Sequence, residues 1–236
     1  MQPLTADVTD STVTLLKRAA SLYLGHPRLA LIAMVGLPVV VVNVISRGHW
    51  WLLSFSALLW FAVSFFVVAA LAYGSGELLA GREPGILDAY RRVALRCRTL
   101  LGVMLAHFLG VALPLGTLVG IPVGLYLLVR WWFGPYAAVL NDVSTREALR
   151  ISSSIVKGAW WQMFGRTVAL MSLLSLSVAA TGMLLGLIEP YLALIPYIVG
   201  TLLLPLSTAF YTLLFLNAVD AKLLQSAASP EASLSP

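Results

Sequence analysis

Residues 92–130 read RVALRCRTLLGVMLAHFLGVALPLGTLVGIPVGLYLLVR, with a cluster of arginines at the start, one arginine at the end and no Lys, Arg, Asp or Glu from 99 to 129. A helix that crosses the hydrocarbon of a bilayer needs about 20 mainly apolar residues. The apolar character continues past Arg130 to Asn141, which makes the region long enough for two helices. This stretch therefore predicts a pair of membrane spans rather than the core of a water-soluble domain.

Uncharged runs on either side extend this prediction to most of the chain. Four more of them cover 29–46, 50–76, 167–188 and 190–219. Only 11% of the 236 residues are charged, against about 25% in a typical soluble domain, and the mean hydropathy is +0.92. The predicted fold class is all-α, a polytopic transmembrane helical bundle of about six spans. The expected spans are 29–46, 50–73, 99–119, 122–141, 167–188 and 191–219.

The basic residues fall almost entirely on one side of this map. Every lysine and arginine except Arg47 and Arg130 lies in segments that face the same compartment when the six spans are threaded in order. Membrane proteins keep such residues on the cytoplasmic side. We therefore expect an even number of crossings and both termini in the cytoplasm.

An amphipathic segment precedes each predicted pair of spans. In residues 13–24, 86–97 and 146–159, apolar side chains recur at helical spacing opposite lysines and arginines. Ser144-x-x-Glu147 is a capping box, which predicts that a helix starts there. These segments predict amphipathic interfacial helices on the cytoplasmic side. They are either parts of three repeated units or three ordinary interfacial connectors.

The same pattern predicts the domain organisation. Residues 1–224 are expected to form a single transmembrane helical domain, which can be divided into hairpin units at 11–74, 84–141 and 144–219. Residues 225–236 are mostly Ser, Ala and Pro. Because such a segment cannot bury a core, we expect a mobile C-terminal tail.

Arg130 is the one basic residue inside a predicted span, where a lone charge costs about 2.5–3.5 kcal/mol. It could face the bundle interior and pair with a carboxylate, for which Glu77 is a candidate, or with open backbone carbonyls. Alternatively, the spans around Pro114 and Pro122 could form a short or re-entrant hairpin that leaves Arg130 near the cytoplasmic interface. The aromatic residues that would then form an interfacial belt beside it are Trp131, Trp132 and Tyr136.

His107 is the one histidine inside a predicted span. Neutral imidazole is a good metal ligand, so His107 could bind a haem or pigment cofactor. The alternative is a histidine that hydrogen bonds to a neighbouring helix, which we favour because no second histidine lies at a comparable depth. We expect no cofactor and no metal site.

Motifs that would indicate catalysis are missing from the chain. It contains no Gly-x-Ser-x-Gly, no His-Glu-x-x-His, no Cys-x-x-Cys and no phosphate-binding Gly-Lys-Ser. Because these motifs are missing, we do not expect an enzyme.

Prolines interrupt several apolar helices, as they do in transporters, although proline is also common in transmembrane helices generally.

The cationic segments predict a binding surface at the membrane. Juxtamembrane lysines and arginines gain about 1 kcal/mol each near an anionic leaflet, although they could also serve orientation alone. Because this charge borders apolar spans, we expect anionic lipid headgroups of the bilayer, or a protein partner, and no nucleic acid. The residues expected to bind are Arg91, Arg92, Arg96, Arg98, Arg146, Arg150 and Lys157.

The region from Val119 to Leu170 carries a series of family motifs. They are VGIPVG (119–124), RWWFGPY (130–136), ND (141–142), REALR (146–150), SSSIVKG (152–158) and WWQMFG (160–165). The region resembles the six-span membrane domain attached to some bacterial glycerophosphoryl diester phosphodiesterases, and related stand-alone membrane proteins. It departs from the family pattern at Ile121-Pro-Val-Gly124 and at Asn141-Asp142, where a Glu is usual.

The resemblance implies an integral membrane module of mostly unknown activity in the bacterial cytoplasmic (inner) membrane. No soluble phosphodiesterase domain is present in the sequence, so that activity is not expected. The leading hypothesis is a non-catalytic module that organises anionic lipid or a protein partner through its basic interfacial helices. The alternatives are a small transporter or permease with a site around Arg130, and an accessory subunit of a larger membrane complex.

Overall fold

The structure, a computed structural model, describes residues 11–38, 42, 50–186 and 195–232. The regular elements in these ranges are helices, and no strand occurs among them. Five segments are long and apolar enough to cross a membrane, by length and composition. They are Ser54–Leu79, Cys97–Leu115, Ile121–Leu140, Trp160–Leu184 and Ile195–Leu223. The prediction of an all-α, polytopic membrane protein is confirmed.

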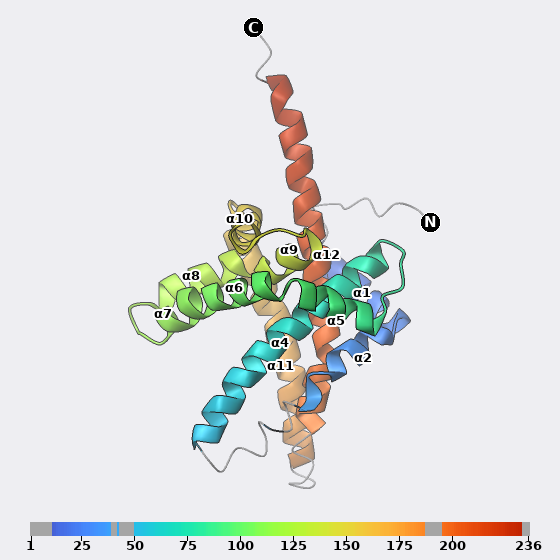
Figure 1. The fold of residues 1–236 in the computed structure, drawn as a ribbon, viewed down its shortest axis with the longest axis vertical. Coiled ribbons are helices and arrows are strands. Elements are labelled where there is room, and N and C mark those ends of the chain that lie inside the picture. Colours follow the sequence, from blue (N-terminus) through green and yellow to red (C-terminus); the bar gives the residue numbers. More distant parts are fainter. Residues whose placement is uncertain (1–10, 39–41, 43–49, 187–194, 233–236) are drawn as a thin grey trace.

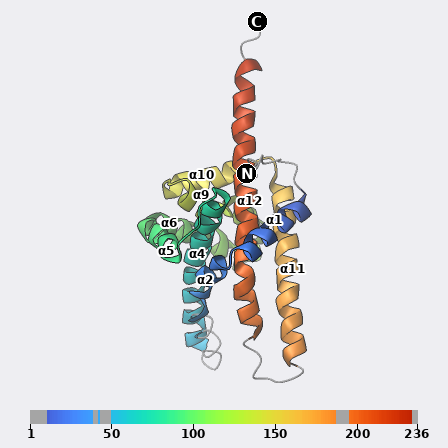
Figure 2. The same cartoon turned by 90° about the vertical axis from the view of Figure 1, so that its right-hand side faces the viewer.

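Three long helices form the axis of the molecule. They are α4 (Trp50–Leu79), α11 (Trp160–Gly186) and α12 (Ile195–Ala232). α12 packs against both of the others, and α11 and α12 run side by side (Figures 1 and 2). α4 has apolar residues on all of its sides, which suits a helix that is surrounded by lipid and by other helices.

Residues 97–131 fold into a bent hairpin. α6 (Cys97–His107) continues through the π-helical turn η2 (Phe108–Ala112) into α7 (Leu113–Leu115), and the chain returns in α8 (Ile121–Trp131). Pro122 occupies the first turn of α8, where the missing N–H breaks no helical hydrogen bond, and Pro114 directly follows the π-helical turn. The turn between them is tight, because a Cβ on Gly120 would lie 2.3 Å from the carbonyl oxygen of Pro114.

This hairpin runs across α11 and α12 rather than alongside them. In Figure 1, α6 and α8 extend sideways from the long helices. Leu118 and Val119, in the turn between α7 and α8, are 87% and 88% exposed. The direction of these helices favours the short or re-entrant hairpin over two full spans, although their length and composition would allow them to cross.

The first predicted span, 29–46, falls partly outside the described residues. Its beginning contains α2 (Arg28–Met34), which packs against α4 and α12 and buries Leu29 and Ile32. Seven residues are too few to cross a bilayer. A sixth span is therefore not established in the part of the chain that the structure describes.

Three amphipathic helices lie around the long ones in one layer, at the level of the α6–α8 hairpin (Figure 1). They are α1 (Thr12–Gly25), α5 (Ile86–Leu95) and α10 (Thr145–Val156). Ser11 Oγ accepts from the Thr14 N–H at 3.2 Å, and Ser144 Oγ accepts from the Glu147 N–H at 3.4 Å. These two contacts are the N-caps of α1 and α10, so the predicted helix start at Ser144 is confirmed.

α5 and α10 each precede a pair of apolar helical segments in the chain, as expected for repeated units, whereas the first segment after α1 falls partly outside the described residues. The pair after α5 nevertheless runs across the pair after α10 (Figure 1). Equivalent units would be expected to place their helix pairs in equivalent directions. A threefold repeat therefore stays a prediction.

The centre of the fold is a cluster of aromatic rings between α9 (Gly134–Leu140) and α12. The ring of Phe133 lies 6.0 Å from the rings of both Tyr136 and Phe215, and Tyr136 lies 6.4 Å from Tyr211, measured between centroids. All four side chains are buried. Such pairs add about 0.5–1.5 kcal/mol each beyond the burial of their area. Tyr136 is thus a core residue, and its assignment to an interfacial belt is wrong.

α12 extends well beyond the other helices at its C-terminal end (Figure 1). Its helical backbone continues through Ala232, so residues 225–232 of the predicted tail have regular structure. Their mobility stays a prediction, and 233–236 lie outside the described residues.

Candidate functional site

The seven cationic residues that we expected to bind lipid or a partner fall into two groups. Three of them pair with carboxylates of the chain itself, and the other four have no such pair within the described ranges. The paired residues are Arg92, Arg96 and Arg150. The separation matters because a cation that is already paired and half-buried has less to offer a ligand.

Asp142 brings Arg92 and Arg96 together. Its Oδ1 lies 3.1 Å from Arg92 Nη2 and also pairs with Arg96 Nη2. The Arg92 guanidinium lies 6.0 Å from the centroid of the Tyr73 ring, a cation–π contact. The two arginine side chains are only 30% and 26% exposed. They join α5 to the turn before α10, and this contact does not support their expected role in lipid binding.

The backbone of Asp142 is adapted to this position. Its φ of 61° lies in the left-handed region, which asparagine and aspartate enter more readily than other non-glycine residues. The tight turn after α9 leaves its carboxylate where both arginines reach it. The sequence marks this place only as an Asn-Asp dipeptide, typical of a turn.

Arg150 is exposed but not free. Its Nε and Nη2 donate to the two carboxylate oxygens of Glu147, one turn earlier, at 2.8 and 2.7 Å. Hydrogen bonding from Arg150 lowers the pKa of Glu147, and the same contact raises the pKa of Arg150. An exposed pair of this kind adds little stability because water screens it, but it neutralises the charge of Arg150.

The remaining expected cations have no carboxylate partner among the described residues. Lys17 on α1 shares this property, and it is exposed like the others. The full set of unpaired, exposed cations is Lys17, Arg91, Arg98, Arg146 and Lys157. They come from α1, α5, the first turn of α6, α10 and the residue that follows α10, so all of them belong to the layer of interfacial helices (Figure 1).

Arg130 lies in the last turn of α8 and is half-buried. Its Nη1 donates to the hydroxyl of Tyr126 at 3.2 Å, and its guanidinium lies 5.7 Å from the centre of the Tyr126 ring. No carboxylate in the described ranges pairs with it. A cation at the C-terminal end of a helix interacts favourably with the helix dipole. The expected alternative of a pair with Glu77 is not found.

Glu77 instead binds Arg82, just after the end of α4. Arg82 Nη2 donates to Glu77 Oε1 at 2.9 Å, and a second bond joins Arg82 Nε to the other carboxylate oxygen. A neighbouring pair, Arg28 with Glu83, links the start of α2 to the α4–α5 connection. Both pairs lie at the level of the interfacial helices and were not foreseen from the sequence.

The break between α8 and α9 is closed by a serine from a distant helix. Pro135 has no N–H and cannot continue the ladder of α8, so backbone groups near it need other partners. Ser152 of α10 donates its hydroxyl to the carbonyl oxygen of Arg130 at 2.8 Å and accepts from the Phe133 N–H at 3.1 Å. Ser152 is fully buried. Sequence reasoning missed it, although its place beside Ala148 and Ile155 on the buried face of α10 could have revealed it.

His107 packs inside the α6–α8 hairpin. Its Nδ1 lies 3.0 Å from the carbonyl oxygen of Val103, and the ring also hydrogen bonds to the backbone of Trp131. The rings of Phe65 and Trp131 lie edge-on at 5.9 and 6.2 Å. These contacts favour the interpretation of His107 as a histidine that is held by hydrogen bonds, one within its own helix and one to α8. Within the described ranges, no three His, Cys, Asp or Glu side chains form a group that could hold a metal ion.

Aromatic rings flank the basic layer where α11 begins. Trp160 stacks on Phe164 at 5.1 Å and donates its indole N–H to the Tyr126 carbonyl oxygen at 3.3 Å. Trp161 is 77% exposed. Residues Gly158 to Gln162 also line an open cavity of about 450 Å³. Exposed tryptophans beside basic residues are typical of the boundary between hydrocarbon and headgroups.

Comparisons with protein-family models, with curated proteins and with solved structures found no match to this chain.

Proposed function

We propose that this chain is a non-catalytic integral membrane module that binds anionic lipid headgroups through the exposed cations of its interfacial helices. The observation that carries the proposal is the set of five unpaired, exposed cations in one layer: Lys17, Arg91, Arg98, Arg146 and Lys157. None of the five forms an ion pair with a carboxylate in the described part of the protein, so their charge is not cancelled there.

The layer of interfacial helices is suited to the depth of the lipid headgroups. The long helices α4 and α11 leave it on one side and carry the apolar surface that suits hydrocarbon, including Leu173 and Leu176 on α11, which are 48% and 69% exposed. Trp161 is suited to the boundary itself. We further propose that this leaflet is the cytoplasmic leaflet of a bacterial inner membrane, with both termini in the cytoplasm, because basic residues are retained on that side.

The test is the thermal unfolding of the purified protein with added lipid. A ligand at free concentration c that binds the folded state stabilises it by RT ln(1 + c/Kd), so the rise in unfolding temperature reports the affinity. Phosphatidylglycerol should stabilise the wild-type chain more than phosphatidylcholine does. The triple variant Arg98→Gln, Arg146→Gln, Lys157→Gln should lose affinity for phosphatidylglycerol about a hundredfold, since each of the three cations near anionic lipid is worth about 1 kcal/mol.

A matched control is available on the same helix. Glu147→Gln with Arg150→Gln removes two charges that cancel each other, so the double variant should bind phosphatidylglycerol as the wild type does. If the triple variant kept its full affinity, or if the double variant lost as much affinity as the triple one, the proposal would be wrong.

The two other functions have less support. A permease would need a polar path near Arg130, but Arg130 contacts Tyr126, and the nearby cavity at the start of α11 is lined by Gly158 to Gln162 instead. An accessory role in a larger complex would suit the exposed apolar α6–α8 hairpin, although nothing on that surface indicates a particular subunit.

A further inference from the structure

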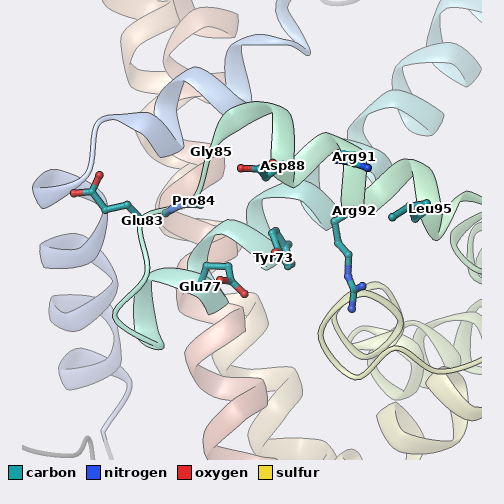
Figure 3. Close-up of a pocket in the computed structure, with 9 residues that line it drawn as sticks. All are labelled: Tyr73, Glu77, Glu83, Pro84, Gly85, Asp88, Arg91, Arg92 and Leu95. Atoms are coloured by element: carbon teal, nitrogen blue, oxygen red, sulfur yellow. The ribbon is translucent and has the colours of Figure 1, made fainter.

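A polar cavity lies where α4 passes into α5 (Figure 3). It has a volume of about 280 Å³ and opens to the surface. Its walls carry three acids and two arginines, with few apolar side chains. The lining consists of Tyr73, Glu77, Glu83, Pro84, Gly85, Asp88, Arg91, Arg92 and Leu95. Charges of both signs in one small cavity indicate a ligand that itself carries both signs.

Most of these charges already have partners outside the cavity wall. Arg82 binds Glu77, and Arg28 binds Glu83. Arg92 pairs through Nη2 with Asp142, while its Nε is buried and has no acceptor among the described residues. Asp88 and Arg91 are the two charged groups of the lining without a charged partner in the part of the chain that the structure describes.

Asp88 and Arg91 are one turn apart on α5, a spacing at which opposite charges commonly pair. They form no ion pair, and both side chains are exposed. Figure 3 shows the carboxylates of Glu83 and Asp88 toward the α4–α5 connection and the two arginines further along α5. A cationic group placed by Asp88 and an anionic group placed by Arg91 would satisfy both at once.

The cavity also borders apolar surface. Leu95, which lines it, is 73% exposed, and Leu87 on the same helix is 81% exposed. Large exposed leucines on an amphipathic helix in the interfacial layer suit contact with acyl chains. This neighbourhood favours a lipid over a water-soluble ligand of the same headgroup chemistry.

We propose that this cavity binds the headgroup of an aminophospholipid, with the primary ammonium at Asp88 and the phosphate at Arg91. A quaternary ammonium fits less well. Such groups are recognised by several aromatic faces, whereas the lining has one aromatic ring, Tyr73, over which Arg92 already lies. An ammonium with its own hydrogens can donate to a carboxylate. The excess of acids in the lining disfavours a headgroup that is only anionic.

The cavity shares Arg91 with the anionic-lipid surface that we proposed above, but the two proposals are tested through different residues, so either can fail without the other. That surface is tested through Arg98, Arg146 and Lys157, none of which lines the cavity. The lipid classes also differ, because the cavity selects for the ammonium and the outer surface selects for net negative charge.

The experiment is native mass spectrometry of the full chain, delipidated and then supplied with equal amounts of phosphatidylethanolamine and phosphatidylcholine of identical acyl chains. The wild type should retain phosphatidylethanolamine about three- to tenfold more than phosphatidylcholine, since N-methylation removes hydrogen bonds to a charged acceptor. Asp88→Asn should abolish this preference, and Arg91→Gln should lower retention of both lipids. Soluble glycerophosphoethanolamine, offered at equal concentration, should not displace the lipid.

Matched controls keep the result interpretable. Arg146→Gln removes one exposed cation outside the cavity, so it should leave the ratio of the two lipids unchanged. Retention of phosphatidylglycerol by Asp88→Asn should equal that of the wild type, which also reports that the variant is folded. The proposal is overturned if the wild type does not distinguish the two lipids, or if Asp88→Asn keeps the wild-type ratio. Displacement by the soluble headgroup would overturn the assignment to a membrane lipid.

Discussion

The sharpest mutational prediction concerns Ser152, the buried serine of α10 that bridges the break between α8 and α9. Its hydroxyl makes two hydrogen bonds, to the Arg130 carbonyl oxygen at 2.8 Å and from the Phe133 N–H at 3.1 Å. Ser152→Ala removes both and leaves a donor and an acceptor of the main chain without partners. Each lost bond is worth about 1 kcal/mol, and each unsatisfied buried group costs about 1–3 kcal/mol. We therefore expect a loss of about 2–4 kcal/mol in the free energy of unfolding.

The assay is thermal unfolding in a mild detergent, combined with hydrogen exchange of the backbone amides. Ser152→Ala should lower the unfolding temperature and speed exchange at Phe133. Ser154→Ala is the control, because Ser154 is exposed and donates only to the carbonyl oxygen of Ile151 in its own helix, at 2.8 Å. Equal unfolding temperatures for the two variants would refute the role of Ser152 as the closure of this break.

Three further predictions concern the surroundings of this break. Asp142→Asn keeps a residue that tolerates the left-handed φ but removes the carboxylate that Arg92 and Arg96 share. Because these pairs are half-exposed, thermal unfolding should show a loss of about 1 kcal/mol in the free energy of unfolding. Unchanged stability would show that the pairs do not join α5 to the turn. The hairpin runs across α11 and α12 and should not reach the outer face of the membrane. The cysteine of Leu118→Cys should therefore resist a membrane-impermeant maleimide added from outside the cell. Ready labelling would indicate two full spans. The pKa of Glu147 is lowered by its hydrogen bonds from Arg150. The stability that these hydrogen bonds give to α10 is therefore fully present above the ordinary pKa of a glutamate and is lost as the pH falls through the lowered pKa. The acid unfolding curve of Glu147→Gln should lack this pH dependence. A variant curve with the same pH dependence as the wild type would contradict the prediction.

The class of fold was predictable because it depends on hydropathy alone. Runs without charge and long enough to cross a bilayer leave few alternatives to helices, and α4, α11 and α12 coincide with such runs. Hydropathy does not determine the direction in which a helix runs. The segments that contain α6 and α8 are apolar enough to cross a membrane, but the orientation of these helices depends on packing against α9 and α10, which is not recorded in their own composition.

Which of the cations form ion pairs was less predictable from the sequence. Arg91 and Arg92 are adjacent on α5 and look equivalent in the sequence. Arg91 is exposed and unpaired, whereas Arg92 binds Asp142, a residue that lies fifty positions further along the chain (142 − 92). Only the positive φ of Asp142 and the packing of α9 place that carboxylate near α5. A pairing of this kind is a property of the tertiary fold.

Arg130 shows a third case, in which the sequence left two alternatives that the structure separates. A carboxylate partner was plausible because the cost of an unpaired charge in hydrocarbon is high. The break before Pro135 ends α8 at Trp131, so Arg130 lies at a helix end beside Tyr126 and does not need such a partner. The same break makes Ser152 indispensable, which composition alone could not reveal.

The composition of the lipid shell around the protein tests the central proposal most directly. The chain would be extracted from its membrane in polymer-bounded discs, and the lipids of the discs compared with those of discs that lack it. We expect enrichment of anionic lipid around the wild type, and a fall toward the bulk composition for the triple variant at Arg98, Arg146 and Lys157. A wild-type shell with the composition of the bulk membrane would contradict the account.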